Sequence, residues 1–183
     1  MRLRIIGGKL GGRFIAAPDT SKTHPMSERA RSSLFNIIGD VSGTQVLDAF
    51  AGTGALGLEA LSRGAKSAMF IERDRVAQNV IAENITALRV GDAAKLIRSS
   101  IAAWDETTVL KQFDLIFADP PYHDMQLSTV MRLKKYLKPK GLMILSYSGR
   151  ESAPTVNGVV VVDKRSYGDA ALAFYRLDSK TKE

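Results

Sequence analysis

The tetrapeptide Asp119-Pro120-Pro121-Tyr122 carries the clearest chemical signal in this sequence. It follows an apolar run at 113–118, and open α/β sheets place their chemistry at the carboxyl ends of such strands. Two successive prolines continue neither a ladder nor a helix, so they hold a stiff turn. The turn can present one carboxylate, one backbone carbonyl and one aromatic ring to a planar base that carries an amino group.

These groups suit methylation of an exocyclic amine on a nucleobase. The lone pair of such a nitrogen is delocalised into the ring, so the nitrogen attacks only when acceptors draw on its hydrogens and favour a tetrahedral geometry. Asp119 and the carbonyl of Pro120 are the predicted acceptors, and Tyr122 is predicted to stack on the base. The alternative interpretation is an ordinary proline turn in which Asp119 is a cap.

A second group of candidate residues lies at 46–57, where a strand runs into glycines that open a helix. The glycines fit the dinucleotide pattern G-x-G-x-x-G, which alone is weak evidence. Asp48 favours S-adenosylmethionine over a dinucleotide, because a carboxylate there would repel a pyrophosphate but suits the amino group of S-adenosylmethionine. Ala51, Gly52 and Gly54 are predicted to let the methionyl part of that cofactor lie against bare backbone.

Acidic residues after the next two predicted strands extend this cofactor site. Glu72, followed by Arg73, ends a strand predicted at 68–72, and its carboxylate can accept both hydroxyls of a ribose in NAD and S-adenosylmethionine alike. After a strand predicted at 86–90, Asp92 can accept a hydrogen bond from the adenine amine, and the N–H of Ala93 can donate to the ring. Asp92 can equally cap a helix that begins at Ala93, and both interpretations stay open.

Apolar runs and helical patterns alternate from residue 46 onward, which is typical of βα units on a parallel sheet. We predict helices at 28–38, capped by Ser27, and at about 125–137. No helix fits between Val162 and Ala170, so the last two strands should form an antiparallel hairpin. A Rossmann-like α/β fold, with a mostly parallel seven-stranded sheet ending in such a hairpin, is typical of class I methyltransferases. The predicted strands lie near 46–50, 68–72, 86–90, 113–118, 142–147, 158–162 and 170–176.

The composition of the 183 residues, 45% hydrophobic and 25% charged, predicts one soluble domain with a single sizeable core. No apolar stretch has membrane-spanning length, no signal peptide opens the chain, and the absence of cysteine excludes disulfides and thiolate metal sites. We therefore expect a cytoplasmic, metal-free monomer. Its expected parts are a basic arm with a lead-in helix at 1–40, a methyltransferase domain at 41–178 and a polar tail at 179–183.

Positive charge is concentrated near the start of the chain, whose net charge is +7. Residues 1–31 hold seven basic groups and two acids, together with two pairs of glycines at 7–8 and 11–12 that would let the backbone approach a phosphate chain. A basic arm of this kind is predicted to bind RNA, and the alternative is a solvated, charged terminus. The predicted RNA contacts are Arg2, Arg4, Lys9, Arg13, Arg29 and Arg31.

Several segments taken together resemble the RsmD family over nearly the whole chain. The resemblance implies a substrate, the N2 amine of a guanine in bacterial small-subunit (16S) rRNA, guanine-966, methylated by S-adenosylmethionine on free rRNA or on a ribosomal particle. The sequence departs from the usual family pattern at His24-Pro25-Met26 and at Ser32. The segments that carry the resemblance are Arg4-Ile5-Ile6-Gly7-Gly8-Lys9, Gly12-Arg13, Arg29-x-Arg31 with Leu34-Phe35-Asn36, residues 46–64, Asp119-Pro120-Pro121-Tyr122 and Tyr167-Gly168-Asp169.

The expected mechanism is direct in-line displacement at the sulfonium methyl, without a covalent enzyme intermediate, and three other functions remain open. An adenine-N6 methyltransferase of DNA or RNA uses the same tetrapeptide, usually with Asn first, so Asp119 favours guanine without excluding adenine. A Rossmann oxidoreductase has no use for Asp48 or the Pro-Pro turn. A non-catalytic RNA-binding factor would keep the basic arm and lose the cofactor residues, which are all present here.

Overall fold

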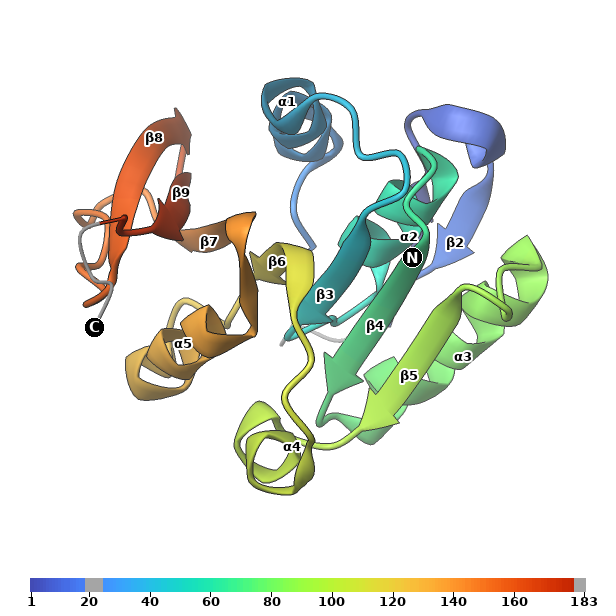
Figure 1. Ribbon diagram of the computed structural model, residues 1–183. Coiled ribbons are helices and arrows are strands. Elements are labelled where there is room, and N and C mark those ends of the chain that lie inside the picture. Colours follow the sequence, from blue (N-terminus) through green and yellow to red (C-terminus); the bar gives the residue numbers. More distant parts are fainter. Residues whose placement is uncertain (19–24, 180–183) are drawn as a thin grey trace.

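The computed structural model describes residues 1–18 and 25–179 (Figure 1). Seven strands form one sheet in the order β5-β4-β3-β6-β7-β9-β8, in which β3 to β7 are parallel and β9 is antiparallel to both neighbours. The predicted methyltransferase-like sheet is confirmed. His24 and most of the tail predicted at 179–183 lie outside the described residues. The strands of the sheet are β3 (Gln45–Ala49), β4 (Ser67–Glu72), β5 (Ala94–Arg98), β6 (Phe113–Ala118), β7 (Leu137–Ser148), β8 (Val159–Tyr167) and β9 (Ala170–Leu177).

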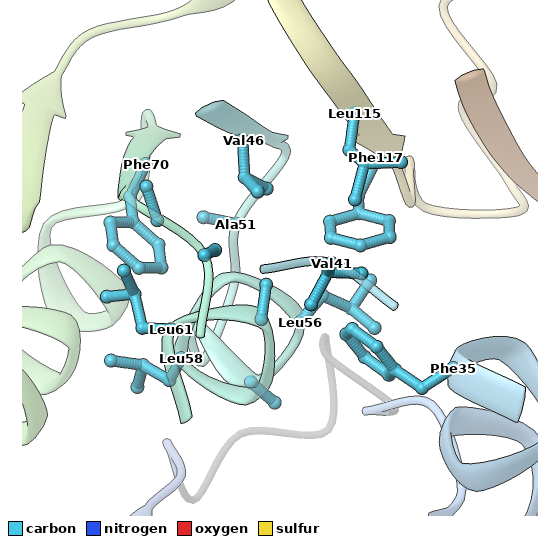
Figure 2. Packing of buried hydrophobic residues seen from close by; sticks show 14 of the residues in the cluster. Phe35, Val41, Val46, Ala51, Leu56, Leu58, Leu61, Phe70, Leu115 and Phe117 are labelled. Atoms are coloured by element: carbon cyan, nitrogen blue, oxygen red, sulfur yellow. The ribbon is translucent and has the colours of Figure 1, made fainter. Parts of the chain in front are cut away.

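Helices cover both faces of this sheet. Three of them, α1 (Glu28–Ile38), α2 (Ala55–Ser62) and α3 (Arg75–Leu88), pack on one face, and α4 (Ile101–Thr107) and α5 (Leu127–Leu133) pack on the other. Figure 2 shows residues of the hydrophobic core between the sheet and the first three helices. In this core the ring centres of Phe35 from α1 and Phe117 from β6 are 5.7 Å apart. Burial on both faces explains the unbroken apolar run at residues 115–118 of β6. Within residues 1–18 and 25–179, no helix has both the length and the apolarity needed to span a bilayer.

The third parallel strand lies later in the chain than predicted. Residues 86–88 belong to α3, which ends at Arg89 in the left-handed conformation with φ of 57°. Ala77, Ile81 and Leu88 are buried at helical spacing, and their packing outweighs the strand preference of the β-branched residues near the end of the helix. The strand predicted at 86–90 is therefore wrong, and β5 at 94–98 takes its place.

The helix predicted at 125–137 is also shorter in the structure. It is α5, which is followed by a 3-10 turn, η2 (Lys134–Tyr136), so that the Lys138-Pro139-Lys140-Gly141 segment lies inside β7. Pairing between the strands skips this segment, because Phe113 faces Leu137 while Leu115 already faces Leu142. Proline is tolerated there, since the bulge requires no ladder hydrogen bond from it.

The hairpin predicted at the end of the sheet is confirmed, with β8 running on to Tyr167 and a turn at Gly168-Asp169. A contact between two hydroxyl groups links this hairpin to α1, near the start of the chain. The Tyr167 hydroxyl lies 2.5 Å from Oγ of Ser33 on α1. The lead-in helix and the last hairpin are thereby joined across the sheet.

The basic segment at the start of the chain is folded onto the domain. β1 (Arg2–Arg4) and β2 (Phe14–Ala16) form a two-stranded antiparallel sheet, and the loop between them carries a 3-10 turn, η1 (Gly8–Leu10). The buried carboxylate of Glu59 on α2 accepts the N–H groups of Ile6 and Gly7, each at 2.8 Å. The segment is thus anchored by backbone hydrogen bonds to a buried charge.

Gly8 of this loop has a packing role in the fold. A Cβ at Gly8, where φ is +75°, would lie 1.9 Å from the carbonyl oxygen of Ser62. Only glycine can adopt that conformation at that distance. At Gly8 the missing side chain therefore lets the loop pack against the end of α2.

Candidate active site

The parallel strands end at one edge of the sheet, which we call the carboxyl edge. Ala49 near the end of β3 pairs with Ile71 of β4 and with Ala118 of β6. Asp48, Glu72 and Asp119 therefore lie on three adjacent strands, which are spaced about 4.8 Å apart. The structure brings together the carboxylates that the sequence assigned to the cofactor and to the base.

Asp48 is the most deeply buried of these carboxylates, with 1% of its surface exposed. Its Oδ2 accepts a hydrogen bond from the N–H of Gly57 at 2.8 Å. Burial raises the pKa of Asp48 well above its usual range, the Gly57 hydrogen bond opposes the rise, and the charges of Asp119 and Glu72 add to it. Among the described residues no basic side chain pairs with this group, so the site is electrostatically suited to a cation.

The loop between β3 and α2 has an uncommon backbone conformation. Phe50 has φ of 63°, which is rare and strained for a bulky residue, while Gly52 and Gly54 have φ of 55° and 75°. Glu72 fixes the loop, because its Oε2 accepts the N–H of Gly52 at 2.7 Å and its Oε1 accepts that of Asp74 at 2.8 Å. The backbone of Ala51 is held in turn by a 3.0 Å hydrogen bond to Ile71.

The proline turn follows β6 directly. Burial raises the pKa of Asp119 to about 6, and a hydrogen bond from Ser146 opposes the rise. Tyr122 is 41% exposed, and its hydroxyl lies 2.8 Å from Oγ of Ser146. Pro120 is buried and Pro121 half-buried, and the Pro120 carbonyl accepts no hydrogen bond from any described residue. The turn therefore offers a carboxylate, a free carbonyl and an exposed ring in one place.

Ser146 is a site residue that the sequence analysis missed. It lies on β7 with 2% of its surface exposed and contacts the turn through the Tyr122 hydroxyl. The available signal was a serine inside the apolar run of β7. The bulge at 138–141 decides which residue of β7 reaches the level of Asp119, and that offset cannot be read from spacing alone.

Asp92 and Ala93 lie at the opposite end of the sheet. They precede β5, and the Ala93 carbonyl accepts the N–H of Ala68 at the start of β4. The incorrect strand at 86–90 had placed them at the carboxyl edge, and no helix begins at Ala93 either. Ser99 and Ser100 stand at the carboxyl edge after β5 instead, where Ser99 donates its N–H to the Glu72 carbonyl and Ser100 caps α4.

Comparisons with known proteins agree with this geometry. The family model described as conserved hypothetical protein 95 matches residues 3–176. The chain is 33% identical to ribosomal RNA small subunit methyltransferase D of Escherichia coli, over 85% of this chain and 79% of that protein. It is 31% identical to the putative rRNA methyltransferase YlbH of Bacillus subtilis, over 95% of this chain and 98% of that protein. The chain belongs to the RsmD family.

Solved structures place the RsmD family chain among methyltransferases. The putative methyltransferase yhhF of Escherichia coli superposes with a TM-score of 0.86 at 30% identity, covering 98% of this chain and 99% of that one. A putative methyltransferase, SMU.776, solved in complex with SAH, has a TM-score of 0.66 at 15% identity, and it covers 81% of this chain and 48% of that one. The latter likeness concerns the fold alone.

Arg31 is wrongly predicted as an RNA contact, because only 1% of it is exposed. Its Nη2 donates to the Arg4 carbonyl at 2.6 Å, and burial lowers the pKa of its guanidinium. No described residue accepts a hydrogen bond from its Nε or Nη1. The side chain joins α1 to β1 and is out of reach of a phosphate.

The other predicted RNA residues lie on the surface, some of them with partners. Arg4 forms an ion pair with Glu28 at 2.6 Å, and the Arg2 guanidinium lies 5.0 Å from the centre of the Phe14 ring. Arg13 donates to the carbonyl of Ala87 near the end of α3. Lys9 and Arg29 are exposed without a partner among the described side chains. Arg73, predicted for the cofactor, is also exposed and lies 3.7 Å from Asp124.

Proposed function

We propose that the protein transfers a methyl group from S-adenosylmethionine to the exocyclic N2 amine of a guanine in bacterial small-subunit rRNA. The carrying observation is the proline turn of Asp119 and Tyr122 beside the carboxylates of Asp48 and Glu72 at one edge of the sheet. Relatives named as rRNA small subunit methyltransferases support RNA as the substrate. The choice of guanine-966 as the modified nucleotide rests on the resemblance to the RsmD family.

The residues at the carboxyl edge fit this cofactor. Asp48 and Asp119 are held in an environment that raises their pKa values, and no basic side chain among the described residues pairs with either. S-adenosylmethionine supplies the methyl group on a positively charged sulfonium when bound, and its amino group is a second positive charge. Asp48 holds that amino group. Each oxygen of Glu72 accepts one backbone N–H and keeps a lone pair for a ribose hydroxyl.

The proline turn orients the target amine. Asp119 and the carbonyl of Pro120 accept its two hydrogens, while the ring of Tyr122 stacks on the base, which must leave its own stack to enter the site. Positioning of this kind can supply up to about 7–11 kcal/mol of the barrier. The carboxylate of Asp119 adds electrostatic stabilisation as positive charge develops on nitrogen, and the amine proton then leaves through Asp119 or water.

The test is to map methyl groups by mass spectrometry on small-subunit rRNA, free and in particles, after incubation with labelled cofactor. We expect a single label on the N2 of one guanine, and none with Asp119→Ala. The variant should still bind the cofactor in calorimetry, which shows that it is folded. Label on adenine N6, or no label on either form of the RNA, would overturn the proposal.

A further inference from the structure

A group of basic side chains lies at the end of the sheet opposite the proposed active site. We call this end, where β3 to β7 begin and β9 ends, the amino edge. Seven basic side chains lie in or beside these strand ends, and we call them the basic stripe. They are Lys66, Arg89, Lys95, Lys111, Lys138, Lys140 and Arg176. The same segments hold four acids, Asp40, Asp92, Asp114 and Asp178.

The balance is reversed at the carboxyl edge. Its strand ends and the loops that follow them carry more acids than bases among the described residues. The acids are Asp48, Glu72, Asp74, Asp119, Asp124, Glu151 and Asp169, and the bases are Arg73, Arg75, Arg98 and Arg150. A polyanion is therefore attracted to the amino edge more strongly than to the edge where the base must bind.

Most of the basic stripe is also free of acidic partners. Within the described part of the chain, Lys138 is the only one of the seven in an ion pair, with Asp114 at 2.9 Å. At the carboxyl edge, by contrast, two of the four bases, Arg73 and Arg150, are paired. Unpaired exposed cations leave a net field at the surface, whereas paired ones largely cancel.

The geometry of the stripe suits a chain of phosphates. The sheet order places β5, β4, β3, β6, β7 and β9 side by side, so that Lys95 and Arg176 are separated by about 24 Å. Two open hollows of about 120 and 220 Å³ lie along it. The first is lined in part by Lys95, Lys111 and Asp92, and the second in part by Lys140, Arg176, Asp40 and Asp114. A single small anion could engage only part of this length.

We propose that the basic stripe at the amino edge is a second RNA-binding surface, which holds a part of the rRNA distant from the target guanine. The inference rests on the proposed function for its substrate. The six residues of β4 separate the two edges by about 20 Å, so one RNA must pass around the molecule to touch both. Lys9 and Arg13 flank this surface, because their loop packs on the ends of α2 and α3.

The test compares two double variants that remove the same charge. Lys66→Gln with Lys140→Gln alters the stripe before β4 and in β7, and Lys164→Gln with Arg165→Gln alters two exposed basic residues of β8 outside the stripe. Affinity for naked small-subunit rRNA is measured over a series of salt concentrations, together with single-turnover methylation at saturating RNA. We expect the stripe pair to lower the log–log salt slope by about 1.4–1.8, with an unchanged saturated rate, and the control pair to keep the wild-type slope.

An unchanged slope in the stripe pair, or an equal fall in both pairs, would overturn the inference. A loss of affinity for ribosomal particles without any loss for naked rRNA would also overturn it and would indicate a protein partner. Failure of the proposed function is separable. If the wild-type protein methylates no rRNA yet its salt slope still depends on Lys66 and Lys140, the stripe stands as an RNA surface and the methylation proposal falls.

Discussion

The hydroxyl of Tyr122 lies 2.8 Å from Oγ of Ser146, so the ring of the proline turn is held at its far end by the neighbouring strand β7. Ser146 also opposes the rise in the pKa of Asp119 by hydrogen bonding to its carboxylate. One buried hydroxyl therefore connects the aromatic ring and the carboxylate of the proposed base-binding turn.

Ser146→Ala should shift the pH at which the single-turnover rate is half-maximal to a higher value. The variant loses a hydrogen bond to the charged form of Asp119, and that loss raises its pKa. Tyr122→Phe is the matched control, because it removes the other partner of Ser146 and keeps the ring. We expect its midpoint to stay near that of the wild type, with a rate within a few fold. Equal midpoints in Ser146→Ala and the wild type would contradict this role.

The single-turnover rate at saturating RNA should rise with pH and level off above about 6. The ionised form of Asp119 stabilises positive charge on the amine, and its pKa in the free protein is about 6. A bound cationic cofactor favours the ionised form, so the midpoint should lie at or below that value. Asp119→Asn should give a low rate that does not change across this range. Equal rates in Asp119→Asn and the wild type from pH 5 to 8 would remove Asp119 from the chemical step.

Asp119→Asn should stabilise the protein without cofactor at pH 7.5 and leave its stability unchanged at pH 4. The folded-state pKa is raised from 3.8 to about 6, so the folded state binds the proton more tightly than the unfolded one. That contribution to the free energy of unfolding is fully present below pH 3.8 and is lost as pH rises through 6. The gain at pH 7.5 should be at most about 3 kcal/mol, measured by urea unfolding. Equal stability of both proteins at pH 7.5 would show that the carboxylate is not strained by burial.

Asp48→Asn should weaken binding of S-adenosylmethionine in calorimetry while raising the melting temperature of the protein without cofactor. The amide oxygen can still accept the hydrogen bond from Gly57, and the buried negative charge is gone. Asp48→Ala serves as the comparison, because it leaves the Gly57 N–H unpaired and should cost about 1–3 kcal/mol relative to Asp48→Asn. Normal cofactor affinity in Asp48→Asn would rule out a role for this charge.

Gly8→Ala should destabilise the protein by about 1–3 kcal/mol more than Gly12→Ala. Both glycines have positive φ, +75° and +84°, so the strain of placing a side chain there is similar. Only at Gly8 does the added Cβ meet an atom, the carbonyl oxygen of Ser62 at 1.9 Å, whereas nothing lies within 4 Å of it at Gly12. Equal destabilisation in denaturant unfolding would mean that the loop does not need this close contact.

Strong local patterns predicted much of the fold. Alternating apolar runs identified six of the seven strands of the sheet, and the short link before Ala170 predicted the final hairpin. The prediction of a strand at 86–90 was wrong because it followed the β-branched residues Ile85, Thr86 and Val90, which lie next to a turn. The helical spacing of Ala77, Ile81 and Leu88 indicates the helix that the structure shows. Packing of that helix against the sheet decides the outcome, and packing is not visible in local preference.

The candidate site was predictable where one residue follows one strand. Asp48, Glu72 and Asp119 each end or follow a strand, and parallel pairing brings them together. Asp92 was wrongly predicted as a cofactor residue because the strand before it was misplaced. Ser146 was not predicted because a β-bulge sets its position relative to Asp119. Arg31 was misassigned since a charge in the sequence does not reveal burial, and here the guanidinium donates to a backbone carbonyl inside the fold.

The anchoring of Ile6 and Gly7 to Glu59 sets an order of assembly. The carboxylate that accepts these amides lies 52–53 residues further along the chain. The antiparallel pair of β1 and β2 therefore cannot reach its native position before α2 has packed on β3 and β4, and the loop that must close is long. In pulse-labelled hydrogen exchange during refolding, the amides of Ile6 and Gly7 should become protected later than those of β3, so that the segment around β1 and β2 joins the native structure late.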